Sequence, residues 1–398
     1  MEQSSRKIAW TSAVIHGLVH ASVLLLPTLF GDLQRAFHVS LLDVLAVSNL
    51  MYLVFGLAAI PAGYLADRVG SRTMLIVSAG GCGIALSLVA TARTFPVLAA
   101  ALVMLGLSAG IYHPSGLSLL SRGVVSGERG RAIGIHGVGG NFGEALAPLW
   151  AGLFAAQLGG WRWGFASAAL LSFACVALAL SLPATATAHD HRVPSFGPGL
   201  GGAVTTLRSF WQSRPLRWLL LATFASGFVY RGVFTFLPLH LSGSAGGTLG
   251  ASSLMSLVLL AGIFAQRFGG ELADRLPRER LFLTEVALLA PVLVLLGLTS
   301  GIGLVVMALS FYFLWYLAQP LASALAAAYS DTREHGLLYG AQFAVAFGLG
   351  SFATTLGGLL IEAGGTTLAF VGFGAVAILQ LGAALALVRS VRAPVAAS

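Results

Sequence analysis

Long, unbroken apolar runs restrict the fold of this chain more than any other feature. Residues 301–328 and 366–388, for example, contain no charged side chain over a length that can cross the ~30 Å hydrocarbon core of a bilayer as a helix. Only helices and closed barrels satisfy every backbone polar group in lipid, and barrel strands would alternate apolar with polar residues. The runs do not alternate, so the sequence predicts an all-α integral membrane protein.

The composition agrees with membrane burial and excludes a soluble nucleic-acid-binding protein. Hydrophobic residues make up 57% and charged residues 9% of the chain, against about 25% charged in soluble domains. The formal net charge of +8 comes from arginines in short loops, without a basic helix that could follow a nucleic acid. The 50 glycines indicate closely packed membrane helices. Cys82 and Cys175 fall inside apolar runs and are interpreted as packing residues.

Charged and Gly/Pro-containing turns divide the chain into twelve predicted membrane helices. They are residues 10–30, 43–66, 73–91, 96–120, 131–157, 161–182, 216–240, 249–272, 281–298, 301–328, 337–360 and 366–388. The longest polar stretch separates the sixth from the seventh. We therefore predict an N-terminal six-helix bundle over residues 1–182, a linker over 183–215 and a C-terminal six-helix bundle over 216–398.

The arginines predict the orientation in the membrane, because basic loops stay cytoplasmic. With the N-terminus inside, the outer loops hold only Arg35, Arg93 and Arg162. Of the 22 lysines and arginines, 18 lie on the inner side, and Arg231 lies within a helix. Both termini and the linker are thus expected in the cytoplasm of a bacterial-type inner (plasma) membrane.

The two halves share a sequence repeat. Gly63-Tyr-Leu-Ala-Asp67-Arg68 recurs as Gly270-Glu-Leu-Ala-Asp274-Arg275. His113-Pro114 corresponds to Gln319-Pro320, and His136 corresponds to Gln342. Three matches in the same order, each on the equivalent helix of its half, are typical of transporters built from duplicated halves.

The first copy of that repeat carries a recognisable loop motif. Gly63, Asp67, Arg68, Gly70 and Arg72 resemble the loop between the second and third helices of the major facilitator superfamily. The resemblance implies two pseudo-symmetric six-helix halves and a cytoplasmic gating role for this motif and for its second copy, Gly270, Asp274 and Arg275. The alternative is a charged loop that only fixes topology.

The fifth predicted helix carries a glycine pattern that is similar to the antiporter motif of that superfamily. Its members are Gly134, Gly143, Ala147, Pro148 and Gly152, with alanine at two glycine positions of the motif. Gly139, Gly143, Ala147 and Ala151 also form a ridge at i, i+4 spacing on which another helix can pack. The pattern favours export, and general glycine packing is the alternative.

A narrower resemblance points to the fosmidomycin-resistance branch of drug–proton antiporters. It rests on Tyr112-His113-Pro114, on the glycine-rich run from Gly137 to Gly143, and on His16-Gly-Leu-Val-His20 in the first helix. In that branch the position of His20 is usually acidic, so the coupling or substrate chemistry of this chain is expected to differ.

Ionisable residues inside membrane helices are costly and usually face a cavity, so they form the predicted proton and substrate pathway. Four are histidines: His16, His20, His113 and His136. They could relay protons or serve as hydrogen-bonded structural groups. The spacing of His16 and His20 would also suit Zn²⁺ or Ni²⁺, but no cysteine or carboxylate cluster is apparent nearby, so no metal and no cofactor are expected.

Glu144, which we interpret as the one deeply placed carboxylate, is the candidate proton carrier, with a packing role as the alternative. Arg231, midway along the seventh helix, could attract an anionic solute or neutralise Glu144. The matched Gln319 and Gln342 extend the pathway, and Tyr312, Trp315 and Tyr316 add an aromatic face that could hold a solute or simply pack.

Together these features predict a secondary active transporter rather than an enzyme, since the sequence contains neither a Walker-type nor a nucleophile motif. We expect a monomer that exports a small drug-like or organic-acid compound in exchange for protons by alternating access. Its partners would be the small-molecule substrate, protons and the lipid bilayer, with no nucleic acid. The alternatives are a proton-coupled importer of a small organic anion or metabolite and a membrane sensor or scaffold that transports nothing.

Overall fold

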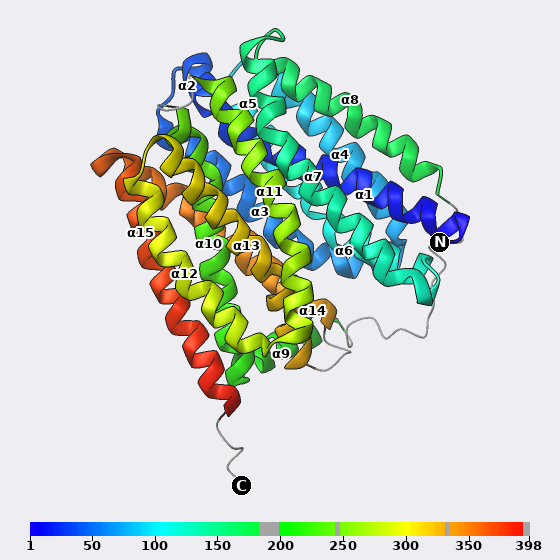
Figure 1. The fold of residues 1–398 in the computed structure, drawn as a ribbon. Helices are drawn as coiled ribbons and strands as arrows, with labels where there is room; N and C mark the ends of the chain where they lie inside the picture. Colours follow the sequence, from blue (N-terminus) through cyan, green and yellow to red (C-terminus); the bar gives the residue numbers. More distant parts are fainter. Residues whose placement is uncertain (183–198, 243–246, 331–334, 393–398) are drawn as a thin grey trace. The chain divides into compact units, whose positions relative to one another are not determined.

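The computed structural model describes residues 1–182, 199–242, 247–330 and 335–392, and this part of the chain is built from helices without a β-strand (Figure 1). The predicted all-α class is therefore confirmed. Helices α1 to α8 span Gln3–Leu24, Phe30–Phe37, Leu41–Val69, Ser71–Thr91, Phe95–Gly110, Tyr112–Gly123, Arg129–Ala156 and Trp161–Leu180. Helices α9 to α15 span Gly199–Gln212, Arg214–Ser242, Thr248–Arg275, Arg278–Leu298, Gly301–Ala328, His335–Phe343 and Phe352–Arg392.

Ten of the described helical stretches are long and apolar enough to cross a membrane. Two features account for the difference from twelve predicted helices. The stretch Leu337–Val391 covers 55 residues, and its long helix α15 is interrupted by non-helical backbone at Gly364 and Gly365. Helix α7 has 28 residues but is rich in glycine and carries His136, Asn141 and Glu144, so its hydropathy is too low for this criterion.

Several predicted helices are broken. Proline has no N–H, so Pro114 cannot donate to the carbonyl of Gly110, four residues earlier, and α5 ends at that residue before α6 begins. The first predicted helix changes to a 3₁₀ turn over Leu26–Leu29, which contains Pro27. The eleventh contains a π-helical segment over Ala344–Gly348. The predicted linker also contains the helix α9, while residues 183–198 lie outside the described part.

The chain separates into two compact units. One comprises Met1–Ser195 with Leu237–Leu260, and the other comprises Phe196–Phe236 with Ala261–Ser398. The second half of α10 and the first part of α11 thus belong to the first unit. The domain boundaries inferred from the sequence remain a prediction.

Glycine governs the tightest helix contact of the first unit, between α1 and α7. A Cβ on Gly143 would overlap the main chain of Gly17, and a Cβ on Gly139 would overlap the main chain of Ala13. The predicted ridge on α7 is therefore a real packing surface. Gly152 of the same motif instead faces Ser252 of α11, and Gly134 faces open space.

The second unit repeats this arrangement. A Cβ on Gly350 would meet the main chain of Gly227 on α10 at 2.8 Å, and Gly350 stands 207 residues after Gly143, the offset between the two copies of the loop motif. A close glycine contact thus joins the first helix of each half to the glycine-rich helix of the same half, as expected for duplicated halves.

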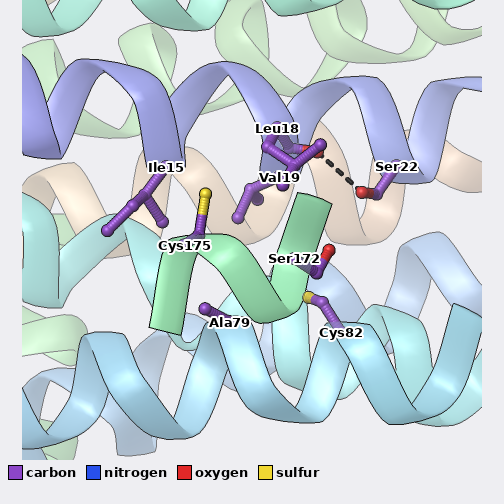
Figure 2. A pocket seen from close by; sticks show the side chains of 8 residues that line it. All are labelled: Ile15, Leu18, Val19, Ser22, Ala79, Cys82, Ser172 and Cys175. Carbon is purple, nitrogen blue, oxygen red and sulfur yellow. Dashed lines mark hydrogen bonds between the residues drawn. The ribbon is translucent and has the colours of Figure 1, made fainter. Parts of the chain in front are cut away.

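Helices α1, α4 and α8 enclose a small cavity in the first unit (Figure 2). Its lining is largely apolar and includes both cysteines, Cys82 from α4 and Cys175 from α8, which are buried. Ser22 on α1 donates to the carbonyl of Leu18 at 2.7 Å instead of bonding across the cavity. Both cysteines therefore act as packing residues here.

Candidate functional site: a buried histidine cluster

Three helices of the first unit bring the predicted histidines together. Helix α1 supplies His16 and His20 one turn apart, α6 supplies His113, and α7 supplies His136. The rings of His16 and His136 are stacked with centroids 4.0 Å apart. The ring of His113 lies 5.2 Å from His16 and 5.1 Å from His20, edge-on to both. All four histidines thus belong to one cluster.

Glu144 joins the cluster from α7. One carboxylate oxygen, Oε1, lies 3.4 Å from Nδ1 of His20, and the side chains of His20 and Glu144 are 12% and 6% exposed. Glu144 stands two turns after His136 on the same helix, so both face α1. The structure therefore places the predicted proton carrier in direct contact with a histidine.

Local backbone features create the room for this cluster. A Cβ on Gly140 would lie 2.5 Å from Nδ1 of His16, so only glycine leaves space for that imidazole. Tyr112, beside the break between α5 and α6, donates to the carbonyl of Ser12 at 2.5 Å and so fixes α6 against α1. The hydroxyl of Ser12 lies 2.9 Å from Nδ1 of His136 and holds that ring.

Hydrogen-bond directions within the cluster determine where protons reside. Nδ1 of His16 lies 2.9 Å from the carbonyl oxygen of His136, which can only accept, so Nδ1 of His16 carries a proton and donates it. The Nε2 atoms of His16 and His20 are 3.1 Å apart, and a hydrogen bond between them requires one proton on that line.

The contact of His20 with Glu144 bears on how many protons the cluster holds. If Nε2 of His20 donates to His16, a hydrogen bond or ion pair between Nδ1 of His20 and Glu144 requires either a protonated Glu144 or a protonated Nδ1 beside a carboxylate. If Nε2 of His16 donates instead, His16 is an imidazolium. In each case the chain His16–His20–Glu144 holds one proton more than two neutral imidazoles and a carboxylate. The arrangement can therefore store and release a single proton.

The other predicted pathway residues lie in the second unit. Arg231 is 2% exposed on α10, and its guanidinium lies 6.0 Å from the ring centroid of Tyr230. Trp315 stacks on Tyr230 with centroids 3.7 Å apart, and Tyr312 and Tyr316 are buried beside it on α13. These aromatic residues form a packed cluster. Gln319 and Gln342 are half-buried on α13 and α14.

The loop motif is only partly described. Gly70 between α3 and α4 has a φ of 87°, a left-handed conformation that favours glycine. Arg72 donates to the last carbonyls of α8, to Ala179 at 3.2 Å and to Leu180 at 2.6 Å, which places a cation at a helix C-terminus. Arg68 and Arg275 are exposed, Gly63 is half-buried, and the side chains of Asp67 and Asp274 and the surroundings of Gly270 lie outside the described part.

The interpretation of Glu144 as the one deep carboxylate is wrong. Glu285 on α12 is 2% exposed, and neither of its carboxylate oxygens has a hydrogen-bond partner among the described residues. The signal that could have indicated it is that Glu285 is the one acid in the otherwise apolar stretch Leu281–Leu298. A buried carboxylate without a partner favours the neutral form.

A cluster of histidines and a carboxylate within a multi-helix membrane bundle favours a transporter of small molecules over an enzyme. The pattern of the Major Facilitator Superfamily matches residues 12–355. The chain belongs to this superfamily, as the loop motif indicates.

Proteins named for drug resistance are among its relatives. The chain is 24% identical to the fosmidomycin resistance protein of Escherichia coli (strain K12), over 88% of this chain and 84% of that protein. It is 26% identical to the multidrug resistance protein MdtG of Yersinia enterocolitica, over 72% of this chain and 69% of that protein. A match of 28% identity to the uncharacterised transporter Rv1250 of Mycobacterium tuberculosis spans 51% of this chain and 36% of that longer protein.

Solved structures of the same fold include transporters with different tasks. A bacterial homologue of the human lysosomal transporter Spinster, in an inward-facing and unoccupied conformation, has a TM-score of 0.80 at 15% identity, covering 99% of this chain and 100% of that one. A D-xylose–proton symporter has a TM-score of 0.77 at 14% identity, covering 97% of each chain. These likenesses confirm the predicted major facilitator fold.

Proposed function

We propose that this protein is a proton-coupled efflux antiporter that exports a small drug-like or organic-acid compound across a bacterial inner membrane by alternating access. The observation that carries the proposal is the buried series of contacts His16–His20–Glu144, in which one exchangeable proton would be shared. Similarity to the fosmidomycin resistance protein and to MdtG supports export as the direction. The protein works as a monomer, with its termini in the cytoplasm.

Glu144 is the coupling carboxylate in this mechanism. It lies on α7, whose glycine ridge packs on α1, so a small displacement between these two helices changes the contact of Glu144 with His20. Loss of the shared proton leaves a buried charge, which is costly in a membrane bundle and favours reopening of the site to water. Proton uptake and release are thereby linked to helix movement.

The loop motif is proposed to control the cytoplasmic gate. Arg72 already ties the start of α4 to the end of α8. Asp67 and its repeat Asp274 would stabilise the closed cytoplasmic side, and their release would accompany the change of access.

A second candidate is a proton-coupled importer of a small organic anion. The nearly inaccessible Arg231 favours it, since a buried cation in a solute pathway would select anions. Arg231, Tyr312, Trp315, Tyr316, Gln319 and Gln342 would then form the solute side of the pathway. The sensor or scaffold alternative explains the family membership and the shared proton less well.

Transport by reconstituted protein tests the proposal. In proteoliposomes with an imposed pH gradient and a panel of drug-like and organic-acid compounds, wild-type protein should move one of them opposite to the proton flux. Glu144→Gln should abolish gradient-driven accumulation but keep gradient-free exchange, because exchange needs solute binding without net proton movement.

Glu285→Gln is the matched variant, because it alters the other buried carboxylate while leaving the histidine cluster intact. Its gradient-driven transport should persist. Accumulation by Glu144→Gln together with loss of accumulation by Glu285→Gln would assign the proton to Glu285. Movement of solute in the same direction as protons would establish the importer instead.

A further inference from the structure

The same cluster has the composition of a transition-metal site, of which the sequence alone indicated only the pair His16 and His20. His16, His20 and His113 each offer a ring nitrogen, and these three atoms lie within 4.8 Å of one another. The third histidine comes from α6, 93 residues beyond His20 in the chain. We propose that His16, His20 and His113 bind a divalent transition-metal ion such as Zn²⁺, independently of the solute that the protein transports.

The spacing of the ligand atoms is close to that of a bound ion. Tetrahedral Zn²⁺ with bonds of 2.0–2.1 Å to histidine separates two ligand nitrogens by about 3.3 Å. The Nε2 atoms of His16 and His20 are already 3.1 Å apart. The longest separation between ligand atoms of the triad must close by about 1.5 Å. A change in the side-chain torsions of His113 would have to bring its ring nitrogen closer by this amount.

Groups behind the ligands orient them as in known metal centres. A metal-binding histidine almost always donates its other ring N–H to a carbonyl or carboxylate. Nδ1 of His16 donates to the carbonyl of His136 at 2.9 Å, and Nδ1 of His20 faces the carboxylate of Glu144 at 3.4 Å. Both histidines therefore turn Nε2 toward the same point. The sequence showed no carboxylate near His16 and His20, and in the structure Glu144 supplies one.

The two Nε2 atoms also explain why a cation would be favoured. With both Nδ1 atoms protonated and no further proton present, their lone pairs face each other at 3.1 Å and repel. A cation between them removes this repulsion. A metal ion and the shared proton would then be alternative occupants of the same position, and three ligands would leave one coordination position open.

The experiment is a binding measurement on the full-length protein in detergent after removal of metals with a chelator. Titration with Zn²⁺ should show one strong site, and Co²⁺ in its place should give the intense visible absorption of a four-coordinate nitrogen site. His20→Gln and His113→Gln should lose this site. Glu144→Gln should keep it with affinity reduced 10–100-fold, because Glu144 only orients His20.

His136→Gln is the control within the cluster, since His136 serves the site through its main-chain carbonyl, which the substitution retains. His38→Asn, in an exposed left-handed position after α2, controls for surface binding. Both variants should bind Zn²⁺ like the wild type. Equal binding by His20→Gln, His113→Gln and wild type, or a Co²⁺ spectrum of the hydrated ion alone, would refute the proposal. Neither result bears on proton-coupled export, which the transport assay tests separately.

Discussion

The contact between α1 and α7 predicts opposite effects for the same substitution at two glycines of one helix. A Cβ on Gly137 meets no atom within 4 Å, whereas a Cβ on Gly143 would lie 2.5 Å from the Cα of Gly17 and still closer to its carbonyl oxygen. Ordinary carbon contacts are about 3.5–4.0 Å long. Gly143→Ala therefore forces the two helices about 1 Å apart, while Gly137→Ala does not.

The magnitudes follow from helix propensity and overpacking. Alanine stabilises an open helical position by about 1 kcal/mol relative to glycine, and overpacking of a tight interior costs about 1–3 kcal/mol. Gly137→Ala should thus stabilise the protein by up to about 1 kcal/mol. Gly143→Ala should be less stable than Gly137→Ala by about 1–3 kcal/mol. Unfolding in mixed detergent micelles, or the melting temperature in one detergent, measures both.

The variant Gly140→Ala distinguishes an effect on helix packing from an effect on proton-coupled transport. Its Cβ would meet the imidazole of His16, a side chain that can move, rather than main-chain atoms. Stability should fall less than in Gly143→Ala, while gradient-driven transport should be lost because the contact between His16 and His20 is disturbed. Equal stability of Gly137→Ala and Gly143→Ala would refute the glycine-contact argument.

Two further predictions concern the gate and the topology. Asp67→Asn should impair transport while insertion and folding stay intact, and Asp274→Asn should do so more mildly; wild-type turnover by Asp67→Asn would reduce the motif to a topological marker. Cysteines placed in the linker over residues 183–215 of a cysteine-free variant should react only with reagents that reach the cytoplasm. Labelling by an impermeant reagent outside intact cells would reverse the orientation.

The sequence predicted much of this fold because the relevant forces are local. The length of the apolar runs locates the helices. The i, i+4 glycines of α7 predict a packing surface, and α1 packs on that surface in the structure. Breaks in regular helices were harder to place. The one at Gly110 follows from the missing N–H of Pro114, whereas the π-helical segment Ala344–Gly348 has no comparable signal in the chain.

The sequence predicted the individual residues of the site but not that they form one cluster. Helical spacing placed His16 and His20 on one face, yet nothing in the sequence fixes the rotation of α6 and α7 that brings His113 and Glu144 to them. The burial of Glu285 could not be predicted for the same reason, since it depends on how α12 packs against α13 and α15. Side-chain contacts between helices are a tertiary property that periodicity cannot supply.

The matched positions of the two halves suggest a division of labour. His113 and His136 of the first half correspond to Gln319 and Gln342 of the second. Glutamine offers hydrogen bonds similar to those of histidine but does not titrate near neutral pH, so the second half keeps polarity at these positions and loses proton exchange. It contributes instead Arg231 and the aromatic cluster around Tyr230. Under the proposed function, the first half would bind the proton and the second half would supply the groups that hold a solute.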